Sequence, residues 1–234
     1  MTMITINTAD GSFGAYMAQP EGNDASSPAP GLLVIQEIFG VNKVMRDICD
    51  EYAAKGYVAV CPDIFWRQEP GIQLTDKTEE HWKRAFELYQ GFDEAAGVED
   101  LKATLAHMRG LDVTNGKVGS MGFCLGGKLA YLMATRSDAD CNVSYYGVGI
   151  DNALDEAASI SNPLLMHIAE KDGFVPPEAQ AKIMTTVGPV TQVEAHTYMG
   201  QDHAFARVGG EHYDKASADV ANDRTAEFLK GNLA

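Results

Sequence analysis

The run from Lys117 to Ala130 is the stretch that most restricts the fold of this chain. It reads as a short buried strand, a glycine-rich turn of the form G-x-C-x-G over residues 122–126, and the opening of an apolar helix. This pattern is the nucleophile elbow, with cysteine where serine usually stands. The turn is so sharp that Gly122 and Gly126 are needed beside Cys124. The positive N-terminal end of the following helix favours a thiolate at Cys124.

The motif alone leaves another interpretation open. Free cysteine is often a buried core residue, and glycine-rich turns from strand to helix also occur in nucleotide-binding folds. The surrounding pattern decides between the two, because a motif is a hypothesis until its context is known.

Strands and helices alternate along the chain. Apolar runs predict strands at residues 3–6, 13–18, 31–36, 57–61, 117–121, 141–146, 163–168 and 192–198. Amphipathic patterns predict helices at residues 42–55, 77–89, 94–108, 177–185 and 213–229, the first capped by Asn42 and ended by Gly56. The first two strands form an antiparallel pair around Asp10-Gly11. Alternation of this kind predicts an α/β fold with a mostly parallel central sheet flanked by helices.

Four reactive side chains each follow a predicted strand: Glu37, Cys124, Asp172 and His203. Because the chemistry of parallel sheets gathers at the carboxyl ends of the strands, we expect the four to converge. The order Cys124, Asp172, His203 is the nucleophile–acid–histidine order of the α/β-hydrolase arrangement. His203 would be the base and Asp172 would fix its tautomer. Taken singly, His203 could be an idle loop residue and Asp172 a turn former before glycine.

Glu37 directly follows the apolar run at residues 32–35. A carboxylate there should be partly desolvated, which raises its pKa. It could hold or remove the thiol proton of Cys124. The alternative is a solvated acid or an ion-pair partner of Arg46.

Composition excludes several kinds of partner. The formal net charge is −15, from 33 acidic and 18 basic residues, which argues against nucleic acid and anionic membranes. We find no membrane-length apolar run and no signal-peptide layout at the N-terminus, and the four cysteines have no disulfide-framework or CxxC spacing. We therefore expect a cytoplasmic protein. We also expect a monomer or a small homo-oligomer.

Several motifs in register resemble the dienelactone hydrolase (carboxymethylenebutenolidase) family. The motifs are QEIFG at 36–40, PD at 62–63, GFCLGG at 122–127, YYG at 145–147, KDGFVP at 171–176 and HAFAR at 203–207. The resemblance as a whole covers nearly the entire chain. The resemblance implies a single α/β-hydrolase domain over residues 1–234. Between Gly147 and Pro163 the chain has room for little more than one short helix, so we expect no large cap.

The family resemblance also implies roles for individual residues. Cys124, His203 and Asp172 would form a triad, with Glu37 as an auxiliary acid that captures the thiol proton. The backbone N–H groups of Ile38 and Leu125 would form the oxyanion hole. Arg207 would hold a substrate carboxylate. No metal or other cofactor is implied, and His167, within an apolar strand, is expected in the core.

The chain departs from the family pattern at two positions. Trp82 stands where the family has a second carboxylate-binding arginine; Lys83 and Arg84 lie nearby, but neighbours on a helix point about 100° apart. Asp202 stands where the family usually has glycine, and its carboxylate could stabilise the charged form of His203. Aromatic residues could wall a pocket for a small unsaturated ring, although about half of them should be core. These are Phe39, Trp66, Trp82, Phe86, Tyr89 and Tyr145.

The function predicted from these observations is hydrolysis of a small ester or lactone through a cysteine thioester. The favoured substrate is dienelactone, converted to maleylacetate. One alternative is a general short-chain carboxylesterase or thioesterase. Another, from a different class, is a non-catalytic small-molecule binder that keeps the fold.

Overall fold

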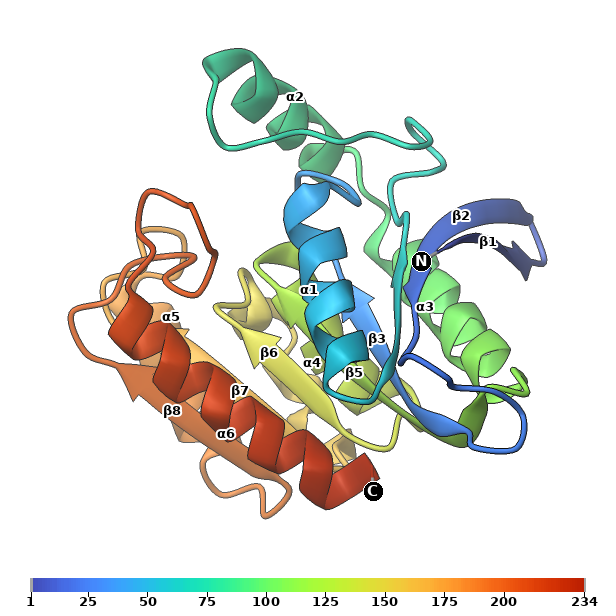
Figure 1. The fold of residues 1–234 in the computed structure, drawn as a ribbon. Helices are drawn as coiled ribbons and strands as arrows, with labels where there is room; N and C mark the ends of the chain where they lie inside the picture. Colours follow the sequence, from blue (N-terminus) through green and yellow to red (C-terminus); the bar gives the residue numbers. More distant parts are fainter. Residues whose placement is uncertain (1, 234) are drawn as a thin grey trace. The chain divides into compact units, whose positions relative to one another are not determined.

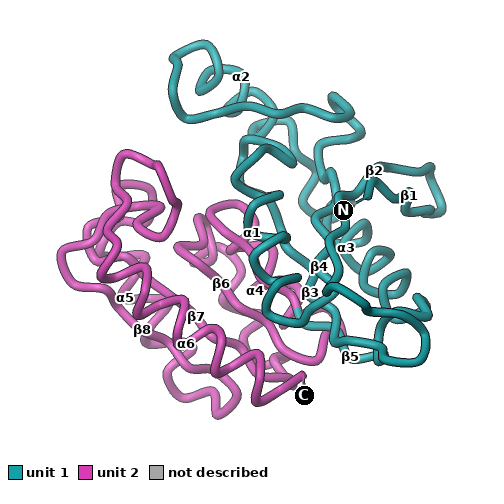
Figure 2. The backbone as a smooth tube through the Cα atoms, viewed as in Figure 1, with its two compact units in different colours: residues 1–119 teal, residues 120–234 magenta. Residues whose placement is uncertain are grey.

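A computed structural model describes residues 2–233. By contacts between residues, the chain falls into two compact units, residues 1–119 and residues 120–234, which Figure 2 shows in different colours. Every strand and helix predicted above is present, with ends shifted by a few residues. The cap at Asn42 is confirmed, because its side-chain oxygen accepts the backbone N–H of Met45 at 3.2 Å.

Within residues 2–233, eight strands form a mostly parallel sheet flanked by helices, as predicted (Figure 1). The first unit contains β1 (Thr2–Thr8), β2 (Gly11–Ala18), β3 (Ala29–Ile35), β4 (Val58–Pro62), α1 (Lys43–Ala54), α2 (Glu79–Gln90) and α3 (Glu94–Arg109). Strand β5 (Thr114–Phe123) has residues in both units. The second unit contains α4 (Leu125–Arg136), β6 (Asn142–Tyr145), β7 (Leu164–Ala169), α5 (Pro177–Val187), β8 (Val193–Tyr198) and α6 (Lys215–Leu233).

In the first unit, the predicted hairpin is confirmed: β1 and β2 pair antiparallel, and β2 then pairs antiparallel with β4. Strands β3 and β4 are parallel. The core strands β3 and β4 are buried on both faces, which explains why they are nearly continuous apolar runs in the sequence.

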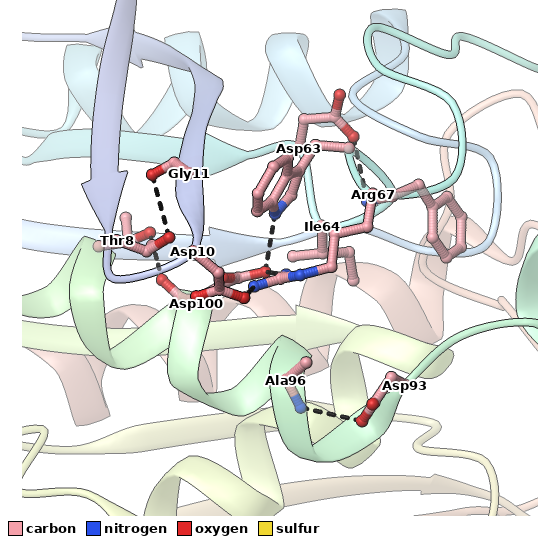
Figure 3. A network of polar contacts seen from close by, with 12 residues as sticks. Thr8, Asp10, Gly11, Asp63, Ile64, Arg67, Asp93, Ala96 and Asp100 are labelled. Atoms are coloured by element: carbon pink, nitrogen blue, oxygen red, sulfur yellow. Dashed lines mark hydrogen bonds and ion pairs between the residues drawn. The ribbon is translucent and has the colours of Figure 1, made fainter.

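A polar network fastens the hairpin turn to α3 (Figure 3). The buried carboxylate of Asp100 accepts the indole N–H of Trp66 at 2.9 Å and also pairs with Arg67. The other end of the Arg67 guanidinium reaches Asp10 in the β1–β2 turn at 2.5 Å. Trp66 packs on Phe13 with ring centroids 5.7 Å apart. Trp66 is therefore a structural residue and not the pocket wall that the aromatic pattern suggested.

In the second unit, strands β5 to β8 are parallel neighbours, α4 packs on β6 and α6 packs on β7. His167 of β7 lies in this core, with one ring nitrogen 2.8 Å from the Tyr198 hydroxyl and the other 2.9 Å from the Thr225 hydroxyl. Burial, followed by the charges of His196 and Arg224, lowers the pKa of His167 to about 3. His167 is thus a neutral side chain that ties β7 to β8 and α6.

The segment between Gly147 and Pro163 holds two short 3₁₀ helices, Ile150–Asn152 and Leu154–Ser159, and no large cap. None of the helices within residues 2–233 combines the length and the apolar character that a membrane crossing requires.

Candidate active site

Cys124 stands between the end of β5 and the start of α4 with a backbone φ of 56°, which is rare for any residue other than glycine. A Cβ atom on Gly122 would lie 1.9 Å from the carbonyl oxygen of Gly126, so no other residue fits at 122. A Cβ atom on Gly127 would lie 2.4 Å from the carbonyl oxygen of Tyr145. The elbow therefore needs glycine at 122, as predicted, and also at 127, where α4 approaches β6 closely.

Three backbone hydrogen bonds hold the strained cysteine. Its N–H donates to the carbonyl of Tyr145 at 3.1 Å, and its carbonyl accepts the N–H groups of Lys128 and Val148 at 3.2 and 3.3 Å. The elbow is thereby fixed to the end of β6 as well as to α4. Leu125 is the first residue of α4, and a helix leaves the N–H groups of its first turn without partners inside the helix. If the sulfur attacked a carbonyl group, the negative charge that develops on the carbonyl oxygen would face this end of the helix.

The structure brings Asp172 and His203 together from two different loops. Asp172 follows β7 and His203 follows β8. The ring Nδ1 of His203 lies 2.8 Å from Oδ2 of Asp172, and both residues are buried. The second oxygen of Asp172 accepts the N–H of Phe174 at 2.9 Å. The His203 side chain is also hydrogen-bonded to the side chain of Cys124. The three residues are therefore connected in the order sulfur, imidazole, carboxylate, all within the second unit.

The electrostatics of this site favour a charged imidazole. Burial lowers the pKa of His203, but the negative charge of the Cys124 thiolate and the hydrogen bonds to Asp172 and Cys124 outweigh burial and raise that pKa to about 10. His203 therefore keeps its proton at neutral pH whenever the Cys124 sulfur carries a negative charge.

We expect the ring resonances of His203, followed by NMR on histidine-labelled protein, to titrate near pH 10 and not near 6.5. In Cys124→Ala the midpoint should fall, because the thiolate charge is the largest cause that raises the pKa. A midpoint near 6.5 in the wild-type chain would contradict the ion pair.

Two aromatic rings that the sequence analysis did not single out pack against His203. The ring of Tyr146 lies edge-on at 5.2 Å and that of Phe174 edge-on at 4.8 Å between centroids. Phe174 is nevertheless 47% exposed. Both residues lie inside motifs that carry the family resemblance, Tyr146 in YYG at 145–147 and Phe174 in KDGFVP at 171–176, and that position is the signal that could have found them.

Arg207 lies in the same loop as His203. A turn brings the two close in the chain, since the N–H of Arg207 donates to the carbonyl of Ala204 at 2.9 Å. The side chain is half-buried and packs beside Gly210. The loop that supplies the imidazole thus also supplies a cation.

Several of the remaining predicted residues belong to the first unit. Glu37, Ile38 and Phe39 follow β3 and are all buried. Phe39 meets the indole ring of Trp82 edge-on at 5.0 Å, and Trp82 stacks on Phe86 at 5.6 Å. Half of the predicted aromatic set therefore forms one cluster on α2 and the segment after β3.

Two residues expected to bind substrate are placed differently. The guanidinium of Arg84 pairs with Glu69 at 2.6 Å and Glu87 at 2.8 Å, and hydrogen bonds to Glu87 and then Glu69 raise its pKa. It is committed to two carboxylates, which argues against its replacing the missing arginine. Tyr145 is fully buried, and its hydroxyl is hydrogen-bonded to Asn222 and Thr225 of α6. It packs β6 against α6 and does not wall an open pocket.

Comparisons with known proteins agree on one family. The model of the Dienelactone hydrolase family matches residues 13–233. The chain is 54% identical over 235 residues to an Azospirillum brasilense protein provisionally named carboxymethylenebutenolidase, with all of both chains covered. It is 40% identical to the carboxymethylenebutenolidase of Pseudomonas putida, over 97% of this chain and 94% of that one. A crystal structure of a provisionally named dienelactone hydrolase from Klebsiella pneumoniae matches with a TM-score of 0.85 at 25% identity, over 98% of this chain and 97% of that one.

Proposed function

The chain belongs to the dienelactone hydrolase family and is a hydrolase of carboxylic ester bonds, and from this premise we propose that it opens dienelactone to maleylacetate through a thioester at Cys124. The observation that carries the proposal is the connected set of Cys124, His203 and Asp172, with a pKa of about 10 at the imidazole.

In the first half of the reaction, the Cys124 thiolate attacks the lactone carbonyl and forms a carbon–sulfur bond. The developing oxyanion is stabilised by the N–H of Leu125 at the start of α4; the resemblance adds the N–H of Ile38. One such donor typically lowers the barrier by about 3–4 kcal/mol. Collapse breaks the ring carbon–oxygen bond, and the enolate that leaves takes the proton from His203. We assign the formation of the Cys124 thiolate to Glu37, which would capture the thiol proton as the resemblance implies.

Acylation itself prepares the second half. The sulfur of a thioester carries no charge, so the largest influence that raises the pKa of His203 disappears, and burial then lowers that pKa. A neutral His203 can take a proton from water, which attacks the thioester while Asp172 holds the ring. The thiolate leaves and the imidazolium–thiolate pair is restored. Because a thiolate is more easily expelled than an alkoxide, good leaving groups such as enolates suit this nucleophile.

The substrate we propose is a small anion. Arg207, in the histidine loop, supplies the charge that would hold its carboxylate. The net charge of −15 makes such a local cation necessary for an anionic substrate. The two short 3₁₀ helices after Gly147 leave no extensive cap for a long acyl chain.

Replacing Arg207 tests this assignment. We expect Arg207→Ala to raise KM for dienelactone by roughly tenfold or more, because a charge-assisted hydrogen bond contributes about 1.5–3 kcal/mol. KM for a neutral aryl acetate should stay unchanged. Arg84→Ala is the matched control and should leave both values unchanged, since Glu69 and Glu87 occupy that guanidinium. Unchanged KM for dienelactone in Arg207→Ala would favour the alternative of a broad short-chain esterase.

We also propose that residues 1–234 work as one domain, because the family match at 13–233 spans both compact units. The cytoplasm is the compartment that we propose, in keeping with four free cysteines.

A further inference from the structure

Asp202, the residue before His203, joins the two loops that carry the acid and the base. One of its carboxylate oxygens, Oδ1, accepts the backbone N–H of His203 at 2.6 Å and that of Gly173 at 3.3 Å. Gly173 directly follows Asp172 in the chain. A single oxygen therefore holds the backbone of the base and the backbone next to the acid.

The bond lies where the histidine loop is strained. Ala204, directly after His203, has a φ of 63°, in the left-handed region that residues with a Cβ rarely adopt. Such a conformation persists only where the surroundings hold it. The N–H of His203, one residue earlier, is fixed by Asp202. Asp202 thus holds the backbone at the residue that carries the imidazole.

Further bonds connect the same two loops at a greater distance from the reacting atoms. The N–H of Lys171 donates to the carbonyl of Gln201 at 2.7 Å, and the N–H of Gly200 donates to Oε2 of Glu170 at 2.7 Å. The Asp202 bonds come next along the loops, beside the 2.8 Å contact between Asp172 and His203. Of these bonds, only the one from His203 to Asp202 involves the histidine backbone itself.

The negative charge of Asp202 contributes less to holding the loops than its acceptor oxygen does. Its other oxygen lies 4.0 Å from Nδ1 of His212, and both side chains are about half exposed, so this ion pair is weak. The oxygen near His203 faces backbone N–H groups. The stabilisation of a charged His203 that the sequence suggested for Asp202 is supplied by Cys124 and Asp172.

We propose that Asp202 is a positioning residue that sets the Asp172–His203 hydrogen bond by accepting two backbone N–H groups. The inference rests on the triad role proposed above. The acceptor oxygen is the essential property and the charge is not.

Asp202→Ala and Asp202→Asn separate these properties, because asparagine keeps an acceptor oxygen and loses the charge. We expect Asp202→Ala to lower kcat for a neutral aryl acetate by about tenfold, with KM unchanged, because the acceptor oxygen that holds the His203 backbone is lost. Asp202→Asn should stay within about threefold of the wild type. The downfield proton resonance of the His203–Asp172 hydrogen bond should be lost or shifted in Asp202→Ala and kept in Asp202→Asn.

Glu170→Ala is the matched control, because it removes an acceptor from the same pair of loops away from the triad. It should lower Tm and leave kcat and the downfield resonance unchanged. Wild-type kcat in Asp202→Ala, or an equal loss in Asp202→Asn, would overturn the inference. His203→Ala separates a failure of the proposed function from a failure of this inference. Full activity in His203→Ala would overturn the proposed function. An inactive His203→Ala beside a fully active Asp202→Ala would overturn only the role of Asp202.

Discussion

Cys124→Ala is expected to lower kcat for ester or lactone hydrolysis by at least about 10⁴-fold, because removing a nucleophile removes the covalent route altogether. Alanine keeps the small side chain that the elbow requires, so the variant should fold. Cys124→Ser should also be strongly impaired, since a neutral hydroxyl replaces the ion pair with His203. The measurement is kcat for dienelactone and for a neutral aryl acetate, with the thermal midpoint as the check on folding.

Cys141→Ala is the matched control for this loss. Cys141 is another free cysteine of the second unit, fully buried, and burial raises its pKa to about 12. Its replacement should leave kcat unchanged. Activity that survives in Cys124→Ala, or that disappears in Cys141→Ala while the protein stays folded, would contradict the assignment of the nucleophile.

Asp172→Asn is expected to have the second largest effect, a fall in kcat of about 10³- to 10⁴-fold. An amide in place of the carboxylate no longer selects the tautomer of His203 and no longer stabilises the imidazolium. The N–H of Phe174 would still have an acceptor, so the loop should keep its shape. Measured across pH, kcat should stay low throughout. Recovery to wild-type kcat at any pH would show that Asp172 does not orient the base.

The elbow could be predicted from sequence because its cause is local. A turn from strand to helix with φ of 56° at Cys124 excludes a side chain at residue 122. The sequence shows this requirement directly, because residue 122 is glycine. The meeting of Asp172 and His203 was also predictable, because parallel strands end at the same edge of a sheet. Neither inference requires knowing which distant side chain pairs with which.

The directions of individual polar side chains were not predictable for the opposite reason. Arg84 is held by Glu69 from another part of the chain, and the hydroxyl of Tyr145 is held by Asn222 and Thr225 on the last helix. Periodicity indicates which face of an element is buried, but it does not indicate the partner. Asp202 belongs to the same class, since its acceptor role depends on the N–H of Gly173.

Mass spectrometry of the acylated enzyme looks for the thioester at Cys124 itself. Asp172→Asn, mixed briefly with dienelactone and quenched in acid, should accumulate the thioester because its base is impaired. We expect a mass increase equal to the ring-opened substrate on the peptide that contains Cys124, absent when Cys124 is alanine. Product formation without any adduct on Cys124, or with the adduct on another residue, would contradict it.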